Sequence, residues 1–123
     1  MSLNGIWVLE IGAIFGWERM STVILEKGRY LGGGAIFSSQ GTYITDGDKV
    51  KIKLQVTQYD EHRIAWGKKR KQFTTVITAK RDGDKIEGKA RLKGAGSTTV
   101  KYPVRFLRLA DLPPFPKKFK KKS

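Results

Sequence analysis

The chain of 123 residues has no cysteine, a single histidine and no long apolar run. Without cysteine it can form no disulfide and has no thiolate for a metal site or for nucleophilic attack. This absence mildly favours a reducing compartment. No apolar stretch approaches the roughly 20 residues that span a bilayer, and the N-terminus lacks the pattern of a signal peptide. We therefore expect a cytoplasmic protein without a membrane span.

The single histidine, His62, has no recognisable catalytic or metal-binding pattern around it. Its acidic neighbours Asp60 and Glu61 make a general base conceivable, but no hydroxyl nucleophile with an orienting partner accompanies them. A metal site needs several ligands at suitable spacing, and these are missing. Glu10 has the parity opposite to its apolar neighbours and is expected to face outward. We expect no catalytic residue, no metal and no cofactor, and predict that the protein is not an enzyme.

Two segments alternate between apolar and polar residues. Over residues 49–59 the apolar positions are Val50, Ile52, Leu54 and Val56, and the intervening ones are Lys49, Lys51, Lys53 and Gln55. Residues 86–93 repeat the alternation, with lysine and arginine again among the polar positions. A period of two indicates strands with one face in a core and the other in water. The sequence thus predicts an antiparallel sheet with a lysine-rich outer face.

Strand-like segments recur along the chain, and short turn sequences separate them. We expect strands over residues 5–13, 21–26, 29–37, 40–45, 49–59, 70–81, 85–93 and 98–109. No segment shows a sustained helical period, which favours an all-β fold. Consecutive hairpins tend to close on themselves because closure removes exposed edges. We therefore predict a single closed antiparallel up-and-down barrel of about eight strands.

The composition changes after residue 111, where three prolines precede a run of lysines. Neither feature suits a strand ladder or a buried face. We predict a barrel domain over residues 1–111 and a disordered Pro/Lys-rich tail over residues 112–123. Within the barrel, the glycine run 32–34 would weaken a flat strand, so it indicates a bulge, a bend or a close approach of backbones.

The interior of such a barrel is either filled by side chains or wide enough for one small ligand. The aromatic residues spaced along the chain suit both arrangements, because they can fill a core or line an apolar cavity. Phe15 and Trp17, in the first predicted loop, would suit a lid at the barrel mouth or a dimer contact. A small apolar ligand is therefore one predicted partner.

Residues 5–7, Gly-Ile-Trp, resemble the Gly-x-Trp motif of the first strand in lipocalin-like and avidin-like barrels. In those barrels the tryptophan closes one end, and a basic side chain of the last strand often lies across its ring. Arg108 shares the parity of Val104 and Phe106, which are expected to face inward. We predict that Arg108 covers Trp7 and that the pair closes one end of a lipocalin-like barrel.

A second resemblance extends over residues 4–110. It consists of Asn-Gly-Ile-Trp at 4–7, a Lys-Gly turn, Tyr-Leu-Gly-Gly-Gly-Ala-Ile-Phe at 30–37, Gln-Gly-Thr-Tyr at 40–43 and an Asp-Gly-Asp turn. This order resembles the Grl-type repressors, which negatively regulate type III secretion genes in enteric pathogens, have lipocalin-like barrels and pair as homodimers.

The resemblance implies a homodimer that sequesters a DNA-binding regulator, a helix-turn-helix activator, through an acidic surface loop. That loop corresponds to residues 45–48, so Asp46 and Asp48 are the implied partner-binding residues. The same two carboxylates also suit plain turn chemistry, since aspartate bonds readily to nearby backbone in turns. Both interpretations remain open at this point.

The net charge of +14 favours anionic partners such as nucleic acid or an acidic surface. Five lysines and one acid from Asp111 onward account for +4, which leaves +10 on residues 1–110. A basic cluster near Trp66 could bind phosphates while the indole stacks on a base. Its members are Arg63, Lys68, Lys69, Arg70 and Lys71. The alternative is a solvated loop, with the other lysines serving solubility.

Two functions follow from these observations. The first is a non-enzymatic binding or regulatory barrel that holds a protein partner or a small apolar ligand. The second is a nucleic-acid or anionic-surface binder that uses the basic cluster and the lysine tail.

Overall fold

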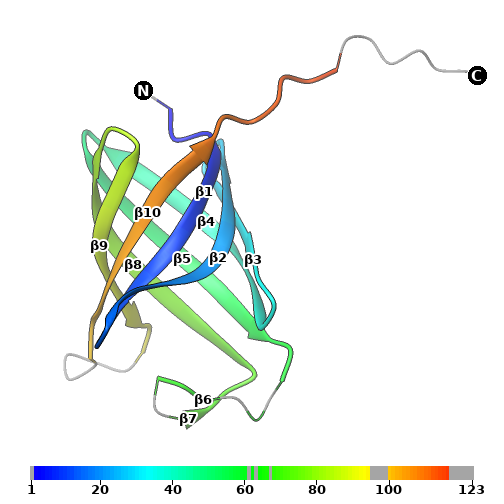
Figure 1. Cartoon of the computed structure of the whole chain (residues 1–123), viewed down its shortest axis with the longest axis vertical. Coiled ribbons are helices and arrows are strands. Elements are labelled where there is room, and N and C mark those ends of the chain that lie inside the picture. The colour runs from blue at the N-terminus through cyan, green and yellow to red at the C-terminus, as the bar shows by residue number, and fades with distance from the viewer. Residues whose placement is uncertain (1, 61, 63, 67, 95–99, 117–123) are drawn as a thin grey trace, which may run out of the picture.

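A computed structural model describes residues 2–60, 62, 64–66, 68–94 and 100–116 and contains one closed antiparallel barrel (Figure 1). Its strands are β1 (Gly5–Ala13), β2 (Gly16–Glu26), β3 (Arg29–Gly33), β4 (Phe37–Asp46), β5 (Lys49–Gln58), β6 (Ile64–Ala65), β7 (Lys68–Lys69), β8 (Gln72–Asp82), β9 (Lys85–Leu92) and β10 (Tyr102–Ala110). Eight of them form the barrel in the order β1-β10-β9-β8-β5-β4-β3-β2, and β6 pairs with β7 as a separate hairpin. The predicted fold class is confirmed.

Strand β5 illustrates why the sequence folds in this way. Its four alternating apolar residues, from Val50 to Val56, are buried, whereas Lys49, Lys51 and Lys53 are exposed. The neighbouring strands β4 and β8 pair along its full length, so the inward residues of all three meet in one core. Burial of one face and solvation of the other fixes the register, because a slip of one residue would exchange the two faces.

Several predicted boundaries were wrong. β2 begins at Gly16 instead of residue 21, and β3 ends at Gly33 instead of continuing to residue 37. The chain reverses after β3, where the Gly34 amide donates to the Phe37 carbonyl at 3.0 Å. The glycine run therefore ends a strand and enters a turn. The predicted loop over residues 60–69 contains the short hairpin β6–β7, and the last strand begins at Tyr102 instead of residue 98.

Two further glycines allow the sheet to curve. A Cβ on Gly41 would lie 1.9 Å from the Lys53 carbonyl oxygen, and one on Gly88 would lie 2.1 Å from that of Thr78. No side chain fits at such distances, so adjacent strands approach each other there only because both residues are glycine. This close approach bends the β4–β5 and β8–β9 pairs around the core.

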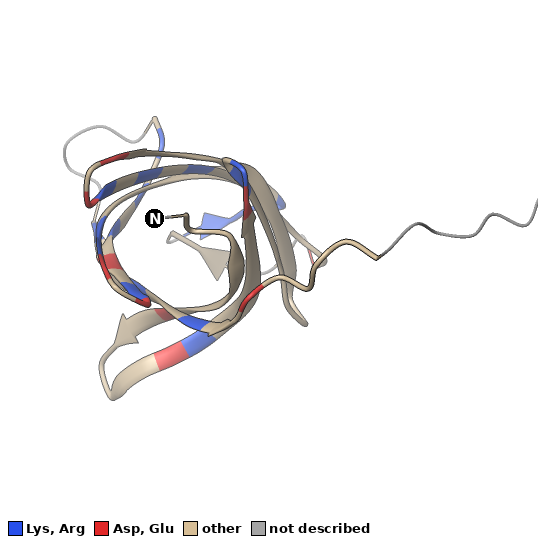
Figure 2. Ribbon diagram, turned by 90° about the horizontal axis from the view of Figure 1, so that it is seen from above, with Lys and Arg blue, Asp and Glu red and all other residues tan. Residues whose placement is uncertain are grey.

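One end of the barrel, which we call the closed end, carries the predicted Trp7–Arg108 pair. The Trp7 ring is fully buried and its Nε1 donates to the Leu3 carbonyl at 3.0 Å. The Arg108 guanidinium carbon lies 4.6 Å from the centre of that ring, as expected from the Gly-x-Trp resemblance together with the strand parity. Residues 2–4 lie over this end of the barrel (Figure 2), and Leu3 is buried in the core.

The Arg108 guanidinium also joins three chain segments at the closed end. It bonds the Asp84 carboxylate at 2.9 Å, the Asn4 carbonyl at 2.7 Å and the Asp111 carboxylate at 3.3 Å. A stacked guanidinium contributes on the order of 1 kcal/mol. Arg108 thus holds the start of β1, the β8–β9 turn and the end of β10 together.

Beyond β10, residues 111–116 contain no strand and lead away from the barrel (Figure 1). The remainder of the predicted tail, residues 117–123, lies outside the described residues, so its disorder stays a prediction. In the part of the chain that the structure describes, no helix is long and apolar enough to cross a membrane.

Candidate ligand-binding site

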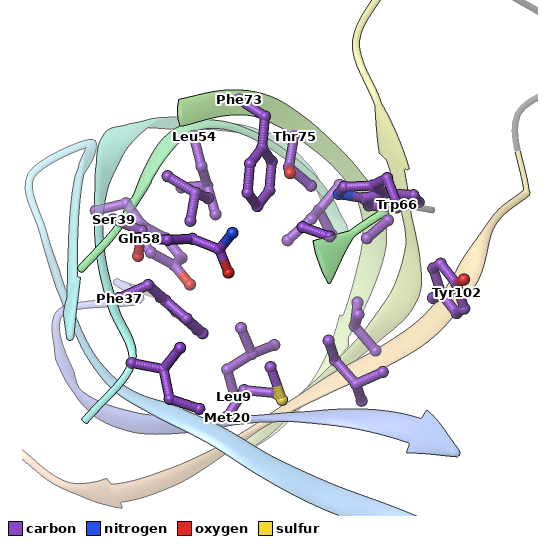
Figure 3. Close-up of a pocket in the computed structure, with 18 of the residues that line it drawn as sticks. Leu9, Met20, Phe37, Ser39, Leu54, Gln58, Trp66, Phe73, Thr75 and Tyr102 are labelled. Carbon is purple, nitrogen blue, oxygen red and sulfur yellow. The ribbon is translucent and has the colours of Figure 1, made fainter. Parts of the chain in front are cut away.

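The end of the barrel opposite Trp7, which we call the open end, leads into a cavity of about 340 Å³ (Figure 3). This volume lies within the range of small-molecule sites, about 300–1,000 Å³. The wall is mostly apolar and aromatic, and its residues include Leu9, Met20, Phe37, Leu54, Phe73 and Trp66. Among the described residues that line it, none is charged.

Four buried polar residues interrupt the apolar wall: Tyr30, Ser39, Gln58 and Thr75. Tyr30 is fully enclosed, and its ring meets the Phe106 ring edge-on with centres 6.0 Å apart. Burial raises the pKa of the Tyr30 hydroxyl above its usual value, which the neighbouring Ser39 hydroxyl opposes. Tyr30 is therefore neutral at physiological pH and can act as a hydrogen-bond donor.

Gly32 makes room for the meeting of Tyr30 and Ser39. A Cβ at this position would lie 2.6 Å from the Ser39 Oγ and 3.2 Å from the Tyr30 Cε1. Gly32 faces Ser39 in the β3–β4 ladder, and the Ser39 hydroxyl and the Tyr30 ring occupy the space that a side chain at this position would take. The first part of the glycine run therefore allows two lining residues, Tyr30 and Ser39, to pack together, and its later part forms the turn.

The hairpin β6–β7 lies at the mouth of the cavity and contributes Trp66. The Trp66 ring meets Tyr102 of β10 edge-on at 5.0 Å between centres, and its backbone has φ +54°. The Arg70 Nε donates to the Ala65 carbonyl at 2.9 Å, and the Gln58 Nε2 donates to the Arg70 carbonyl at 2.6 Å. Gln58, in the cavity wall, is thereby connected through Arg70 to the hairpin that covers the mouth.

The structure separates the members of the predicted basic cluster. Lys68, Lys69 and Lys71 are exposed, while the Arg70 guanidinium is directed to the hairpin carbonyls. Arg63 lies outside the described residues. Trp66 is half-buried and packs against the core and Tyr102, so only part of its ring is accessible.

Asp46 and Asp48 lie at the closed end, in the β4–β5 turn, and both are exposed. Gly47 between them has φ +64°, and the Asp48 carbonyl accepts from the Arg81 amide at 2.7 Å. This backbone bond continues the pairing of β5 with β8, and both carboxylates lie at the surface. They are far from the cavity because the turn and the mouth are at opposite ends of β5 (Figure 1).

Glu10 was expected to be an ordinary outward residue, but it is only 6% exposed. Its carboxylate accepts from the Arg105 Nε at 2.7 Å and from the Arg19 Nε at 3.3 Å. Arg105 in turn lies 4.3 Å above the Trp17 ring. Trp17 is thus part of an outer cluster on β1, β2 and β10, and no lid forms from it, while Phe15 is fully exposed in the β1–β2 turn.

Sequence reasoning missed the polar residues of the cavity, although two of them had a signal. Gln58 continues the parity of the buried positions of β5, and Thr75 has the parity of Ile77 in β8. A polar residue at an inward position is expected to have a partner or a function. The Tyr30–Ser39 meeting had no comparable signal, because it depends on how β3 pairs with β4.

No protein-family model matches this chain, and no curated protein matches it in sequence. The resemblance to Grl-type repressors therefore rests on the motifs alone. The described residues contain no group of three or more acidic or histidine side chains that could hold a metal ion.

Proposed function

We propose that this protein is a non-enzymatic binding barrel that holds a small apolar ligand in its cavity. The observation that carries the proposal is the apolar cavity of about 340 Å³, open at one end of a barrel whose other end is closed by Trp7. Barrels of eight strands are just wide enough to hold one small ligand. Apolar walls with a few placed polar groups are typical of such sites.

The experiment is a titration of the protein with the neutral apolar dye N-phenyl-1-naphthylamine, whose fluorescence rises in apolar surroundings. We expect saturable binding with one site per chain. Ala90→Phe adds a ring at an inward position of the cavity wall and should abolish the signal. Lys89→Phe places the same ring on the outer face of β9 and is the matched control.

Thermal unfolding of both variants verifies that they are folded, because overpacking a core typically costs about 1–3 kcal/mol. If the folded Ala90→Phe variant binds the dye as the original chain does, then the cavity is not the binding site. The proposal would then have no remaining support.

We further propose the regulatory role that the Grl-type resemblance implies: a cytoplasmic homodimer that sequesters a DNA-binding regulator through Asp46 and Asp48. The motif order and the exposure of both carboxylates support it. The chain also provides a matched control, since residues 82–84 form a second Asp-Gly-Asp turn. A helix-turn-helix protein that co-purifies with the chain should be lost with Asp46→Asn/Asp48→Asn and retained with Asp82→Asn.

We propose that two copies pair through the outer face of β2 and β3. Ile24 and Leu31 lie opposite each other in the ladder and are 38% and 43% exposed. Ile24 also pairs with Ile6 of β1, which continues the apolar strip. Sedimentation analysis should give a dimer that Ile24→Lys converts to a monomer. A monomeric original chain would remove the homodimer from the proposal.

The alternative, binding to nucleic acid, is favoured by a different set of lysines from the one the sequence suggested. The outer faces of β5, β8 and β9 carry Lys49, Lys51, Lys53, Lys80 and Lys89. Lys93 follows β9, and its pKa is lowered by the adjacent Lys53 ammonium group. Two neighbouring ammonium groups form a suitable place for a phosphate.

Binding to a random DNA duplex should weaken steeply with salt, because each neutralised phosphate releases a counterion. Lys53→Gln/Lys93→Gln should reduce the salt slope more than Lys68→Gln/Lys69→Gln does. Absence of binding at low salt would eliminate this function.

A further inference from the structure

The Tyr30 hydroxyl is the most unusual polar group of the cavity. Its oxygen is buried and makes no hydrogen bond of good geometry with any residue that the structure describes. Buried polar groups are nearly always paired, because an unpaired one has lost its water without compensation. Tyr30 is one of the residues that line the cavity, so a molecule inside the cavity could supply the missing partner.

The surroundings of this hydroxyl determine what that molecule must offer. Tyr30 is neutral and can donate its proton, and the Ser39 hydroxyl beside it can donate as well. Gly32 allows the two groups to pack together, because Ser39 Oγ and the Tyr30 ring take the space that a Cβ would need. The pair therefore suits a hydrogen-bond acceptor, such as the oxygen of a carbonyl or an ether.

The charge of the molecule is restricted by the rest of the wall. None of the described lining residues is charged, and Arg70, close to the mouth, directs its guanidinium to the hairpin carbonyls. A carboxylate in the cavity would lose its water and gain no opposite charge, which is strongly unfavourable. A neutral molecule avoids this loss.

We propose that the ligand is a neutral apolar molecule with one oxygen acceptor, and that the Tyr30 and Ser39 hydroxyls bind this oxygen. This inference rests on the proposed ligand-holding function and specifies its ligand class. The acceptor lies in the interior beside the fully buried Tyr30. The apolar body of the ligand extends past Phe73 to Trp66 at the mouth. In Figure 3, Ser39 and Gln58 lie on one side of the cavity and Trp66 on another.

The test compares three naphthalenes of nearly equal size as competitors of N-phenyl-1-naphthylamine. They are 2-acetonaphthone, a ketone; 2-ethylnaphthalene, a hydrocarbon; and 2-naphthoate, an anion. We expect the ketone to bind about three- to tenfold more tightly than the hydrocarbon, as one neutral hydrogen bond would provide. The carboxylate should be the weakest of the three.

Tyr30→Phe should remove the advantage of the ketone and leave the affinity of the hydrocarbon unchanged, since the ring keeps its contact with Phe106. Tyr43→Phe is the control, because Tyr43 packs against the core but is not part of the cavity wall. Ser39→Ala provides a second variant, which should also reduce the preference for the ketone, so the test does not depend on the folding of Tyr30→Phe.

The outcomes separate this inference from the proposed function. If the ketone and the hydrocarbon bind equally, or if the ketone advantage persists in both hydroxyl variants, the ligand class is wrong and the cavity remains a binding site. Tightest binding of 2-naphthoate would likewise overturn the neutral ligand. If neither the dye nor any naphthalene binds, the ligand-holding function itself fails.

Discussion

The closed end of the barrel and the cavity that opens at the other end differ in whether their buried polar groups have hydrogen-bond partners. At the closed end, the Trp7 Nε1 has the Leu3 carbonyl as its partner, and Arg108 bonds three groups from three segments. In the cavity, the Tyr30 hydroxyl is buried without such a partner, and at the open end the aromatic side chains Trp66 and Tyr102 remain partly accessible. The polar groups at the closed end are therefore paired, whereas the cavity contains one that is not.

Under the proposed function, stability and binding are assigned to different residues of one sheet. Where a structure only has to be stable, the local backbone and hydrogen-bonding preferences of the residues are expected to agree with the fold. Departures from these preferences are expected at functional sites. The left-handed backbone of Trp66 and the unpaired Tyr30 hydroxyl are departures of this kind, and both residues line the cavity. Substitutions at the closed end should therefore lower mainly the free energy of unfolding, and substitutions around the cavity mouth should lower mainly the affinity for the dye.

The largest expected effect is that of Trp7→Ala at the closed end. Removal of this fully buried ring should lower the free energy of unfolding by about 3–5 kcal/mol, because a large cavity remains and Arg108 loses its contact. Urea titration of the original chain and the variant measures the change. A loss below about 1 kcal/mol would contradict the assignment of stability to this end.

Gly32→Ala should cost about 1–3 kcal/mol of stability, because the new methyl group overlaps the Ser39 hydroxyl and the Tyr30 ring. The same variant should weaken dye binding, since the displaced groups line the cavity. Gly33→Ala is the matched control, for its Cβ would meet nothing within 4 Å. Equal behaviour of the two variants would show that the space beside Ser39 is not needed.

Tyr30 should make the free energy of unfolding decrease at alkaline pH. Its pKa is raised in the folded chain by burial, so above pH about 10 the unfolded chain loses this proton first and folding becomes less favourable. The stability contributed by the neutral group is complete below that pH and declines above it, by at most about 1.4 kcal/mol per pH unit. In urea titrations from pH 9 to 11, Tyr30→Phe should lose stability less steeply than Tyr43→Phe.

The smallest change in stability is expected for Trp66→Ala at the mouth. This side chain is only half-buried, so the free energy of unfolding should fall by about 1 kcal/mol or less, while dye affinity should fall several-fold. Comparison with Trp7→Ala gives the sharpest contrast between the ends. If Trp66→Ala unfolds the chain and leaves dye binding intact, the roles of the two ends are reversed.

The sequence predicted the barrel because alternation in β5 and β9 reports burial of one face directly. It also predicted the Trp7–Arg108 contact, since parity along β10 places Arg108 inside. The hairpin β6–β7 escaped notice because two residues per strand are too few to show a period. The burial of Glu10 could not be predicted either, because one of the two arginines that bond it, Arg105, is 95 residues away in the sequence.

The pairing of β1 with β10 has a consequence for how the chain folds. Glu10 and Arg105, which bond across this pair, are 95 residues apart in the chain, whereas Glu10 and Arg19 are 9 apart. Contacts of such long range require the entropy of a large loop to be lost before they can stabilise anything. During synthesis, one edge of β1 therefore has no pairing partner until β10 has left the ribosome. We expect closure to be the late, slow step of folding, and a chain truncated before β10 to expose two edges and aggregate.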